Sequence, residues 1–353
     1  MRILHVISSA AAGGAEIYVK DLSIEMSKMG HEVFIVFLDR AEEAGRDIAF
    51  EAKFLRELTD KNIRYDFIGK SSRKNPIKGI AALRRITRGF SPDIVHSHLY
   101  YGSVFSWFLP KVKRIYTHHN IRLGAHRFIY KFLDVRVDAY IGICLVCTHL
   151  LKSVSRKRVF HIDNGVDAGR LMKKADYPNS NPVKLLFVGR LSEQKNLDLL
   201  IRSSSNIKNV EFEVIIAGEG PLMEDLKQTA REVGVEERIK FIGNSDSVKK
   251  LLHDADIFVM SSAWEGLPIA QIEATITGLP VLVTDVGGCS EIVDHVGNGE
   301  VSKLDEESFS FHLNKLLKDY PLRKKYHEQA LKNSDKYTIE MSVRKHINVY
   351  QEA

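Results

Sequence analysis

The feature of this sequence that most limits its fold is a rhythm of short apolar runs separated by longer amphipathic segments, which occurs twice. Short runs rich in β-branched residues, with helical patterns between them, are typical of parallel βαβ units. The rhythm breaks near Asn164–Asp167 and in the polar stretch that ends at Pro182, and it restarts at Lys184. The sequence therefore predicts an α/β protein with two Rossmann-like, doubly wound parallel sheets.

The apolar runs place the expected strands. In the first half these are Arg2–Ile7, Glu32–Phe37, Ile94–His98, Arg114–His118 and Ala139–Ile143. In the second half they are Lys184–Gly189, Glu213–Ala217, Ile239–Ile242, Ile257–Met260 and Val281–Thr284. Helical spacing is expected at Asn196–Ser205, Ile269–Thr277, Ser308–Ser334 and Ile339–Tyr350. Doubly wound sheets bind ligands outside the carboxyl ends of their strands, so we expect the site in a cleft between the two halves.

Length and composition narrow the class of protein. The chain has 353 residues, of which 44% are hydrophobic and 27% charged. At about 100–200 residues per domain, this length favours two domains, and the apolar fraction excludes a disordered chain. No run reaches the roughly 18 apolar residues that span a bilayer, and the start lacks a signal-peptide pattern. Three cysteines are too few for a disulfide framework, so a cytoplasmic location is expected.

Charge is distributed unevenly over the two halves. The net charge is +6, but residues 1–167 hold 27 basic and 17 acidic residues, whereas the remainder holds 24 and 28. Residues 51–158 alone hold 22 basic residues against 7 acidic ones. Such a basic half suits an acidic partner, namely nucleic acid, an anionic membrane surface or a phosphorylated substrate. The alternative is that its basic helices are simply solvated.

The stretch with the most chemistry-bearing residues is Asp256–Gly288, DIFVMSSAWEGLPIAQIEATITGLPVLVTDVGG. A buried strand ends before Ser261-Ser262, Glu265 follows in the turn, and Glu273 lies further on in the helix. A helix N-terminus presents free N–H groups and a positive dipole end, so it can hold phosphate oxygens while carboxylates accept hydroxyl hydrogen bonds. The order strand, Ser-Ser, Glu-Gly, helix is a much stronger signal than the spacing of the two glutamates alone.

This stretch resembles the donor-site block of the retaining glycosyltransferases with the GT-B fold, in particular their large fourth sequence family. Four further segments are similar to that family: Gly13-Gly14-Ala15-Glu16, Asn164-Gly165-Val166-Asp167, Gly189-Arg190-Leu191 with Lys195-Asn196, and Gly218-Glu219-Gly220-Pro221. The resemblance covers nearly the whole chain and is weakest over residues 40–90 and 100–135. It implies an acceptor-binding domain over 1–167, a nucleotide-sugar-binding domain over 168–336 and a last helix, 337–353, that crosses back to the first domain.

The same resemblance assigns the donor site. Arg190 and Lys195 are expected to grip the diphosphate, and two cations in a strand-end loop also suit a leaving group that gains negative charge. Glu273 is expected to accept the ribose hydroxyls, and Glu265 to orient the transferred sugar beside the backbone amides that follow it. The predicted donor-binding set is Gly13, Gly14, Gly189, Arg190, Lys195, Gly218, Glu265, Gly266, Leu267 and Glu273. The predicted catalytic set is Glu265, His119, Arg190 and Lys195.

Two strand ends in the first half carry histidines, at positions 96 and 98 and at positions 118 and 119. Alternate residues of a strand face the same side, so His96 and His98 are two conceivable ligands of a metal site. No nearby carboxylate or thiol completes the ligand set, however. The resemblance instead implies one histidine near the reacting sugar. His119 fits the family's Thr-x-His order best, and His118 is the alternative. The acceptor side is assigned to His98, His118 and Asn120.

No metal site and no cofactor are predicted, apart from the nucleotide-diphosphate sugar as a substrate. Asp254-Ala255-Asp256 resembles the Asp-x-Asp metal motif of the other glycosyltransferase fold, but it precedes a buried strand. It is therefore better interpreted as a helix end and a strand start. Cys144 and Cys147 have the spacing of a redox or zinc motif without a second pair, so two small buried thiols are expected.

The leading hypothesis is a retaining, metal-independent glycosyltransferase that moves a sugar from a nucleotide-diphosphate donor, UDP favoured and GDP the alternative, to a saccharide or lipid-linked acceptor. Surface polysaccharide or glycolipid synthesis is the expected setting. The aromatic and basic run from Leu99 to Arg114 suits peripheral contact with an anionic membrane, and the alternative is an ordinary packed helix. A nucleotide-sugar epimerase or phosphorylase would share the fold. A basic nucleic-acid-binding protein is the non-enzyme alternative, although no motif of that class is present.

Overall fold

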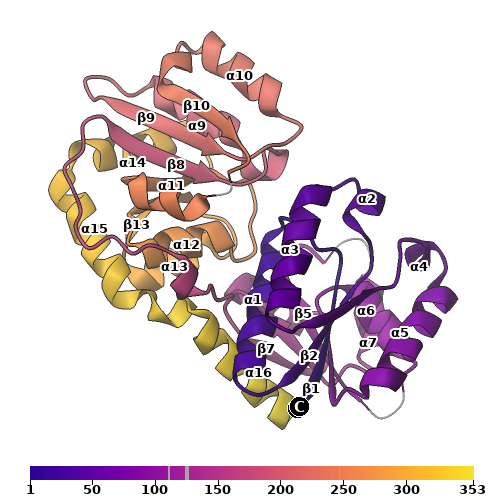
Figure 1. Ribbon diagram of the computed structural model, residues 1–353. Helices are drawn as coiled ribbons and strands as arrows, with labels where there is room; N and C mark the ends of the chain where they lie inside the picture. The colour runs from indigo at the N-terminus through magenta and orange to yellow at the C-terminus, as the bar shows by residue number, and fades with distance from the viewer. Residues whose placement is uncertain (110–111, 124–126, 246) are drawn as a thin grey trace. The chain divides into compact units, whose positions relative to one another are not determined.

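The computed structural model divides into two compact units (Figure 1). It describes residues 1–109, 112–123, 127–245 and 247–353. Unit 1 combines Met1–Val166 with the C-terminal segment Ile339–Ala353, and unit 2 is Asp167–Thr338. Each unit is an α/β structure on a parallel sheet, as the sequence predicts.

Unit 1 is built on a seven-stranded parallel sheet in the order β3-β2-β1-β4-β5-β6-β7. Its strands are β1 Arg2–Ile7, β2 Glu32–Phe37, β3 Arg64–Phe67, β4 Ile94–Ser97, β5 Lys113–His118, β6 Ala139–Gly142 and β7 Arg158–His161. The central strands are buried on both faces, which explains their nearly continuous apolar runs. His5 of β1 is paired in register with His96 of β4, so these two side chains lie on the same face of the sheet.

Helices cover the sheet of unit 1 (Figure 1). They are α1 Gly14–Lys28, α2 Ala41–Ala44, α3 Ile48–Asp60, α4 Ser71–Lys74, α5 Pro76–Phe90, α6 Tyr100–Ser106, α7 Arg127–Leu133, α8 Leu145–Lys152 and α16 Ile339–Glu352. The start of α5 shows why the chain turns into a helix there. The Asn75 side chain accepts a hydrogen bond from the Lys78 amide at 3.4 Å, and Pro76 stands at the first helical position.

The last helix, α16, packs against α1 although more than 300 residues separate them in the chain (Figure 1). The Ile339 amide donates a hydrogen bond of 2.9 Å to the Val166 carbonyl, which fixes the start of α16 beside the end of the first segment of unit 1. The helix buries Val343, His346 and Tyr350 on its inner face. This face is the 3.6-residue pattern that predicts the helix.

Unit 2 carries a six-stranded parallel sheet in the order β10-β9-β8-β11-β12-β13. Its strands are β8 Val183–Val188, β9 Phe212–Ala217, β10 Ile239–Gly243, β11 Ile257–Met260, β12 Val281–Thr284 and β13 Gly299–Ser302. Its α-helices are α9 Leu197–Ser205, α10 Met223–Glu232, α11 Val248–Asp254, α12 Ile269–Thr277, α13 Cys289–Val296, α14 Glu306–Lys318 and α15 Tyr320–Asn333. Its 3-10 turns are η1 Ala168–Arg170, η2 Glu193–Lys195, η3 Glu236–Arg238 and η4 Ser334–Tyr337.

The structure differs from the sequence-based prediction at the sheet edges and in one long helix. Strands β3, β7 and β13 are absent from the prediction because edge strands are short and half-exposed, so they lack a strong apolar run. The single helical stretch expected at Ser308–Ser334 is two helices with a 3-10 turn after them. Asp319 separates the helices, since its carboxylate accepts from the Leu322 amide at 2.9 Å and caps α15.

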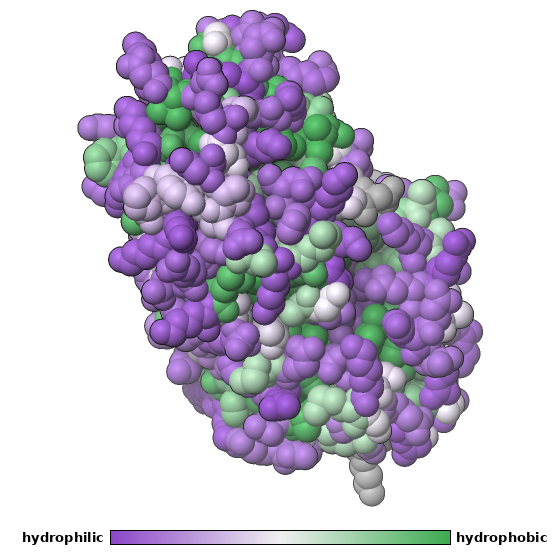
Figure 2. Space-filling view, turned by 60° about the vertical axis from the view of Figure 1, so that its left-hand side comes forward, coloured by the Kyte–Doolittle hydropathy of each residue, from purple (hydrophilic) through white to green (hydrophobic). Residues whose placement is uncertain are grey.

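The surface of the molecule is predominantly hydrophilic on the face drawn in Figure 2, where hydrophobic side chains lie in scattered groups. Among the described residues, the helices are too short or too polar to cross a bilayer.

Candidate functional site

The carboxyl end of β11 in unit 2 places Glu265 in a turn between strand and helix. Its carboxylate is only 5% exposed. Lys195 Nζ lies 2.6 Å from Oε1, Ser262 Oγ donates to the same oxygen at 2.8 Å, and Gln194 Nε2 donates to Oε2 at 3.3 Å. A buried carboxylate with a cation and two neutral donors is held in one orientation. Glu265 and Lys195, which the sequence predicts as site residues, are therefore direct partners.

The loop that carries Lys195 is attached to the end of β11 by its backbone. Ser261 Oγ donates to the Lys195 carbonyl at 3.2 Å and to the Asn196 carbonyl at 2.9 Å. The Ala263 amide donates to the Gln194 carbonyl at 2.8 Å. The two serines of the motif thus have different tasks, because Ser261 positions the lysine loop whereas Ser262 holds the glutamate. Gln194 takes part in both contacts and was not singled out from the sequence.

The helix after this turn, α12, begins without a capping side chain among the described residues, and its first turn contains no acidic residue. Such a helix start is suited to an anion. Glu273 lies on α12, and its Oε1 is 2.6 Å from Nη2 of Arg170. Arg170 belongs to η1, where Asp167 accepts from the Gly169 amide at 2.9 Å. Sequence reasoning missed Arg170, and its position just after the hinge-like Asn164–Asp167 was the available signal.

Two glycines allow the loops of this edge to approach one another. A Cβ atom on Gly218, whose φ is +138°, would lie 2.0 Å from the carbonyl oxygen of Gly189. A Cβ atom on Gly287, with φ +54°, would lie 1.7 Å from the carbonyl oxygen of Glu265. The predicted residues Gly189 and Gly218 are thus in backbone contact, and Gly287 is a packing requirement behind Glu265 that the prediction omitted. Arg190 follows Gly189, is exposed, and has no ion pair within the described part of the chain.

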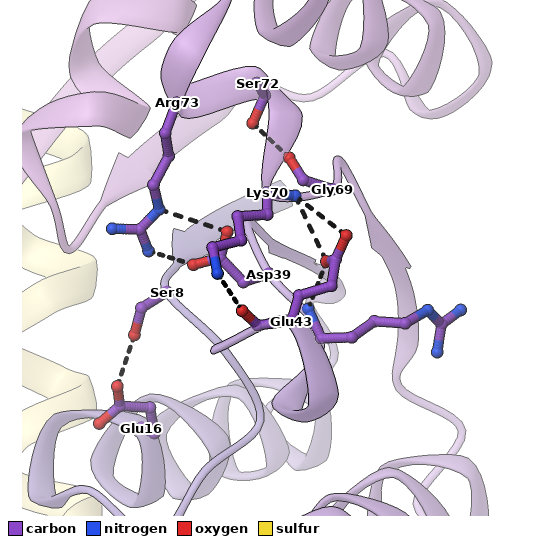
Figure 3. Close-up of polar contacts among 9 residues, drawn as sticks. Ser8, Glu16, Asp39, Glu43, Gly69, Lys70, Ser72 and Arg73 are labelled. Atoms are coloured by element: carbon purple, nitrogen blue, oxygen red, sulfur yellow. Dashed lines mark hydrogen bonds and ion pairs between the residues drawn. The ribbon is translucent and has the colours of Figure 1, made fainter. Parts of the chain in front are cut away.

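The remaining predicted donor residues lie in both units. Gly266 accepts from the Gly288 amide at 2.7 Å through its carbonyl oxygen, and Leu267 is buried with 3% exposure. In unit 1, Gly13 is the N-cap of α1 and Gly14 is its first residue. Glu16, in the first turn of α1, accepts a hydrogen bond of 2.5 Å from Ser8, which follows β1 (Figure 3).

Three histidines of unit 1, His5 in β1 and His98 and His119 just after β4 and β5, form one line of hydrogen bonds. His5 Nδ1 lies 3.0 Å from His98 Nε2, and His98 Nδ1 lies 2.9 Å from His119 Nε2. His5 and His98 are 0% and 4% exposed, while His119 is half-buried at the end of β5. Burial lowers the pKa of His5 and of His119 to about 3, with neighbouring histidines as the second cause. All three rings are therefore neutral near pH 7.

His96 belongs to the same cluster but has its own partners. Its Nδ1 lies 2.6 Å from the Tyr350 hydroxyl of α16, and its Nε2 lies 2.7 Å from Thr117 Oγ1. Burial places the pKa of His96 well below its ordinary value, and His5 and His346 add to this effect. His96 thus uses Nδ1 to hold α16 against the sheet and Nε2 to bond to the neighbouring strand β5.

His118 and His119 face opposite sides of the sheet. His118 Nδ1 lies 3.1 Å from the Tyr116 hydroxyl and 3.4 Å from that of Tyr130, away from the histidine line. Burial lowers its pKa to about 4. Asn120 is exposed, and its carbonyl oxygen accepts from the Cys147 thiol at 3.3 Å. Cys147 and Cys144 are both buried, as expected.

A second polar cluster lies at the ends of β2 and β3 (Figure 3). Arg73 contacts the carboxylate of Asp39 through Nε at 3.3 Å and also through Nη2. Asp39 is 5% exposed, and the Arg73 guanidinium lies 5.4 Å from the centre of the Tyr101 ring. Lys70 contacts Glu43 nearby through its amide at 3.3 Å. Most of these residues lie within 40–90 or 100–135, where the resemblance to the family is weakest, and none of the pairs was predicted.

In the structure a third histidine lies beside the two conceivable metal ligands His96 and His98. His5, His96 and His98 each have a ring nitrogen within 4.8 Å of the others, and all three are buried. The sequence did not indicate His5, because it lies 93 residues from His98. The Asp-x-Asp motif is used differently: Asp254 ends α11, and Asp256 accepts from Ser180 Oγ and from the Lys184 amide, both at 2.8 Å.

Two Rossmann-like sheets and an acidic strand-to-helix turn with a paired lysine define a protein of the GT-B class. Comparison with known proteins agrees. The family described as Glycosyltransferase Family 4 matches residues 12–170, and the family described as Glycosyl transferases group 1 matches residues 171–333. Together the two family models match residues 12–333, and the chain therefore belongs to the glycosyltransferases that these two families describe.

Individual relatives support the same grouping. The O-antigen biosynthesis glycosyltransferase WbnH of Escherichia coli is 36% identical over 44% of this chain and 43% of its own length, so the chain matches less than half of that relative. The E. coli UDP-Gal:alpha-D-GlcNAc-diphosphoundecaprenol alpha-1,3-galactosyltransferase is 25% identical over 73% of this chain and 76% of that protein. The structure of HepE from Anabaena with UDP and glucose superposes with a TM-score of 0.83, at 18% identity and full coverage of both chains.

Proposed function

We propose that this protein is a retaining, metal-independent glycosyltransferase that uses a nucleotide-diphosphate sugar, with UDP as the favoured nucleotide. The single observation that carries the proposal is the Lys195–Glu265 pair of 2.6 Å at the carboxyl end of β11, next to the uncapped start of α12. A cation, a helix N-terminus and an oriented carboxylate in one turn match the three needs of a sugar diphosphate.

Lys195, Arg190 and the start of α12 stabilise the leaving diphosphate in this proposal. Charge develops on the phosphate oxygens as the bond to the sugar breaks, and preorganised cations and amides lower the energy of that state. Arg190 is exposed and its guanidinium offers several donors to phosphate oxygens. These positive groups supply the stabilisation that a divalent cation gives in other enzymes.

The two glutamates bind hydroxyl groups. Glu265 accepts hydrogen bonds from the transferred sugar, and Glu273 accepts them from the ribose. Each carboxylate has a cation on one side, Lys195 for Glu265 and Arg170 for Glu273. A carboxylate has about four lone-pair sites, so the cation orients it and leaves sites for a ligand. Attack by the acceptor from the face of the departing phosphate retains the anomeric configuration without a covalent nucleophile.

Relatives support the choice of donor and acceptor. HepE was crystallised with UDP, and the E. coli galactosyltransferase is named for UDP-Gal and a diphosphoundecaprenol-linked sugar. By analogy we assign a saccharide or lipid-linked acceptor to unit 1, with His119 near the reacting sugar and His98, His118 and Asn120 on the acceptor side. GDP-sugars are the alternative donors, and surface polysaccharide or glycolipid synthesis is the proposed setting.

Contact of unit 1 with an anionic membrane surface is also part of the proposal, at the cytoplasmic face. Phe128 on α7 is 79% exposed and Val135 just after it is 64% exposed. Lys131 lies 5.7 Å from the Phe128 ring centre, and Arg136 lies 5.1 Å from that of Trp107. Exposed apolar rings beside cations suit the headgroup region of anionic lipid. Sedimentation with phosphatidylglycerol vesicles, compared with phosphatidylcholine vesicles, tests this part.

The central experiment is the substitution Glu265→Gln, which preserves size and removes the charge. We expect transfer to fall at least about 100-fold while UDP binding changes little, because the sugar and not the nucleotide contacts this residue. The matched control is Glu224→Gln, an exposed glutamate of α10 in the same unit. Unchanged turnover in Glu265→Gln refutes the assigned role.

Three further measurements separate the alternatives. Thermal shifts with UDP-, GDP- and ADP-sugars identify the base, since a ligand at about 100 times its Kd adds roughly 2.7 kcal/mol. An assay without acceptor reveals an epimerase by isomerised donor, or a phosphorylase by dependence on free phosphate. The anomeric coupling of the product in NMR distinguishes retention from inversion.

A further inference from the structure

The hydrogen-bonded line His5–His98–His119 has a property that none of its members has alone. The rings come from strand β1 and from the residues just after β4 and β5, and the two links measure 3.0 and 2.9 Å. A neutral imidazole carries one N–H donor and one acceptor nitrogen. Each link uses one donor and one acceptor, so the protons of the three rings can be arranged in only two ways.

In the first arrangement every ring is protonated at Nδ1, and the line donates from His5 toward His119. His119 then presents an N–H at Nδ1. In the second arrangement every ring is protonated at Nε2, the line donates in the opposite direction, and His119 presents a lone pair at Nδ1. The tautomer of His119 is therefore coupled to the tautomers of His98 and His5.

The two outer nitrogens of the line are the atoms where a partner is missing. His5 Nε2 and His119 Nδ1 are buried and have no hydrogen-bond partner in the described structure. Buried polar atoms of this kind are rare in proteins and mark positions for water, an ion or a ligand group. His119 Nδ1 lies at the carboxyl edge of the sheet, where ligands of this fold bind, whereas His5 lies deeper on β1.

A metal ion at His5, His96 and His98 is the competing explanation of this cluster. His98 uses both of its ring nitrogens in the histidine line, and His96 uses both of its own toward Tyr350 and Thr117. A metal ligand must offer a lone pair that no hydrogen bond occupies. Coordination would therefore break at least two of these hydrogen bonds, and no carboxylate takes part in the cluster to balance the charge of the ion.

We propose that His5 and His98 are positioning residues that hold the ring of His119 through its Nε2 and set the tautomer that its Nδ1 presents to a hydroxyl group of the sugar substrate. The inference rests on the proposed function, because it assumes a sugar beside His119. A hydroxyl that donates to Nδ1 selects the second arrangement, and one that accepts from Nδ1 selects the first. The orientation of one ligand hydroxyl therefore fixes which nitrogen of each of the three rings carries the proton.

The first test needs no activity. Protein labelled with ¹⁵N-histidine should show a scalar coupling across the hydrogen bond between His98 Nδ1 and His119 Nε2, with all three rings neutral at pH 7. The substitution His98→Leu should remove this coupling. Absence of the coupling in the wild-type protein, or a stoichiometric metal ion that is lost in His98→Leu, overturns the proposal.

The second test is kinetic. His98→Leu should lower kcat about 10- to 100-fold with an unchanged Kd for UDP, because the nucleotide contacts residues of unit 2. His98→Gln keeps a donor and an acceptor in one side chain and should recover part of the loss. The matched control is His327→Gln, an equally buried histidine of unit 2 whose Nδ1 lies 2.7 Å from the Gly278 carbonyl oxygen. A wild-type kcat in His98→Leu, or equal kcat values in the Leu and Gln variants, overturns the proposal.

The two proposals fail in different ways. If the protein transfers no sugar, the kinetic test has no signal, but the NMR coupling still decides whether the histidine line exists. If Glu265→Gln abolishes transfer whereas His98→Leu does not, the proposed function stands and the positioning role is wrong.

Discussion

The two sheets have the same parallel construction, yet their carboxyl ends carry polar groups of opposite character. In unit 2 the end of β11 holds ion pairs, Lys195 with Glu265 and Arg170 with Glu273. In unit 1 a line of neutral histidines runs from His5 within β1 to His98 and His119, just after the ends of β4 and β5. In the proposed function the first arrangement supplies charge to a ligand, and the second supplies orientation and a defined proton position.

This difference shows that net charge and site charge are separate properties. The excess of basic over acidic residues lies in the first half of the sequence, 27 against 17, but its histidine line is uncharged. Residues 251–300 contain no lysine or arginine, and the cations that meet Glu265 and Glu273 come from loops earlier in the chain. The surplus charge of unit 1 is therefore a surface property, whereas the cations of unit 2 are individually placed.

The largest expected effect is acid destabilisation of unit 1. This unit contains six largely buried histidines with lowered pKa values: His5, His96, His98, His118, His119 and His346. Below the ordinary value of 6.5 the unfolded chain binds protons that the folded unit does not, so stability falls as the pH falls. Each histidine whose pKa is lowered in the folded unit makes this fall with pH steeper. Hydrogen exchange should show unit 1 opening before unit 2 between about pH 6 and 4.

A single substitution sharpens this comparison. His346→Met removes one buried ring, 0% exposed, from the set, and should reduce the pH slope of unit 1 stability by about one proton. Equal acid sensitivity of the two units, or a slope that His346→Met leaves unchanged, would contradict the assignment of neutral histidines to unit 1.

The next effect in size is expected in unit 2 for Lys195→Ala. The substitution leaves the 5% exposed carboxylate of Glu265 without its cation, and loss of one partner of a buried pair costs about 3–5 kcal/mol. Ser262 and Gln194 still donate to it, so we expect the lower end of that range in urea denaturation. The double variant Lys195→Met with Glu265→Gln should recover most of the loss, because no charge is left buried. A cost below about 1 kcal/mol would mean that water replaces the lysine.

A smaller effect is expected for Arg170→Ala. The side chains of Arg170 and Glu273 are 28% and 13% exposed, between a buried pair and a surface pair. We expect a loss of about 1–2 kcal/mol in stability and a rise of about 5- to 30-fold in the Kd of UDP, since Glu273 loses its orientation. Calorimetric titration with UDP measures this, with Arg170→Lys as the control that keeps the charge. An unchanged Kd would separate Arg170 from the nucleotide site.

The smallest effect is expected at an exposed pair of the same unit. Arg202 and Asp198 on α9 are 2.8 Å apart, with side chains 42% and 47% exposed. Surface pairs of this spacing contribute about 0.3–0.5 kcal/mol, so Arg202→Ala should lower stability by no more than that. Urea denaturation checks this, and a cost similar to that of Lys195→Ala would show that burial does not explain the strength of the Lys195 pair.

Much of the fold follows from local sequence patterns. Ile257–Met260, Val281–Thr284 and Ile269–Thr277 have the predicted bounds, because four buried residues in a row or a clear helical period leave few alternatives. The edge strands β3 and β7 escaped prediction because solvent on one side removes the apolar pattern, and β13 escaped it because its two buried positions are the polar residues Glu300 and Ser302. Polar and apolar positions then mix as in a loop.

The candidate site likewise contains residues that local sequence patterns predict and residues that they do not. Glu265, Glu273 and Lys195 were predicted because each stands in a recognisable frame of strand, turn and helix. Arg170 and His5 were not predicted, because their partners lie 103 and 93 residues away in the chain and no local sequence pattern indicates such a pair.

The sequence by itself determined the two α/β halves, the strand-to-helix turn with its glutamates, and the uneven charge. Only the tertiary structure decided which cation meets which carboxylate, that His118 and His119 face opposite sides, and that His5 completes the histidine line. The physical reason is that periodicity and turn chemistry act between neighbours in the chain. The partners of a strand-end side chain depend instead on the order of strands in the sheet.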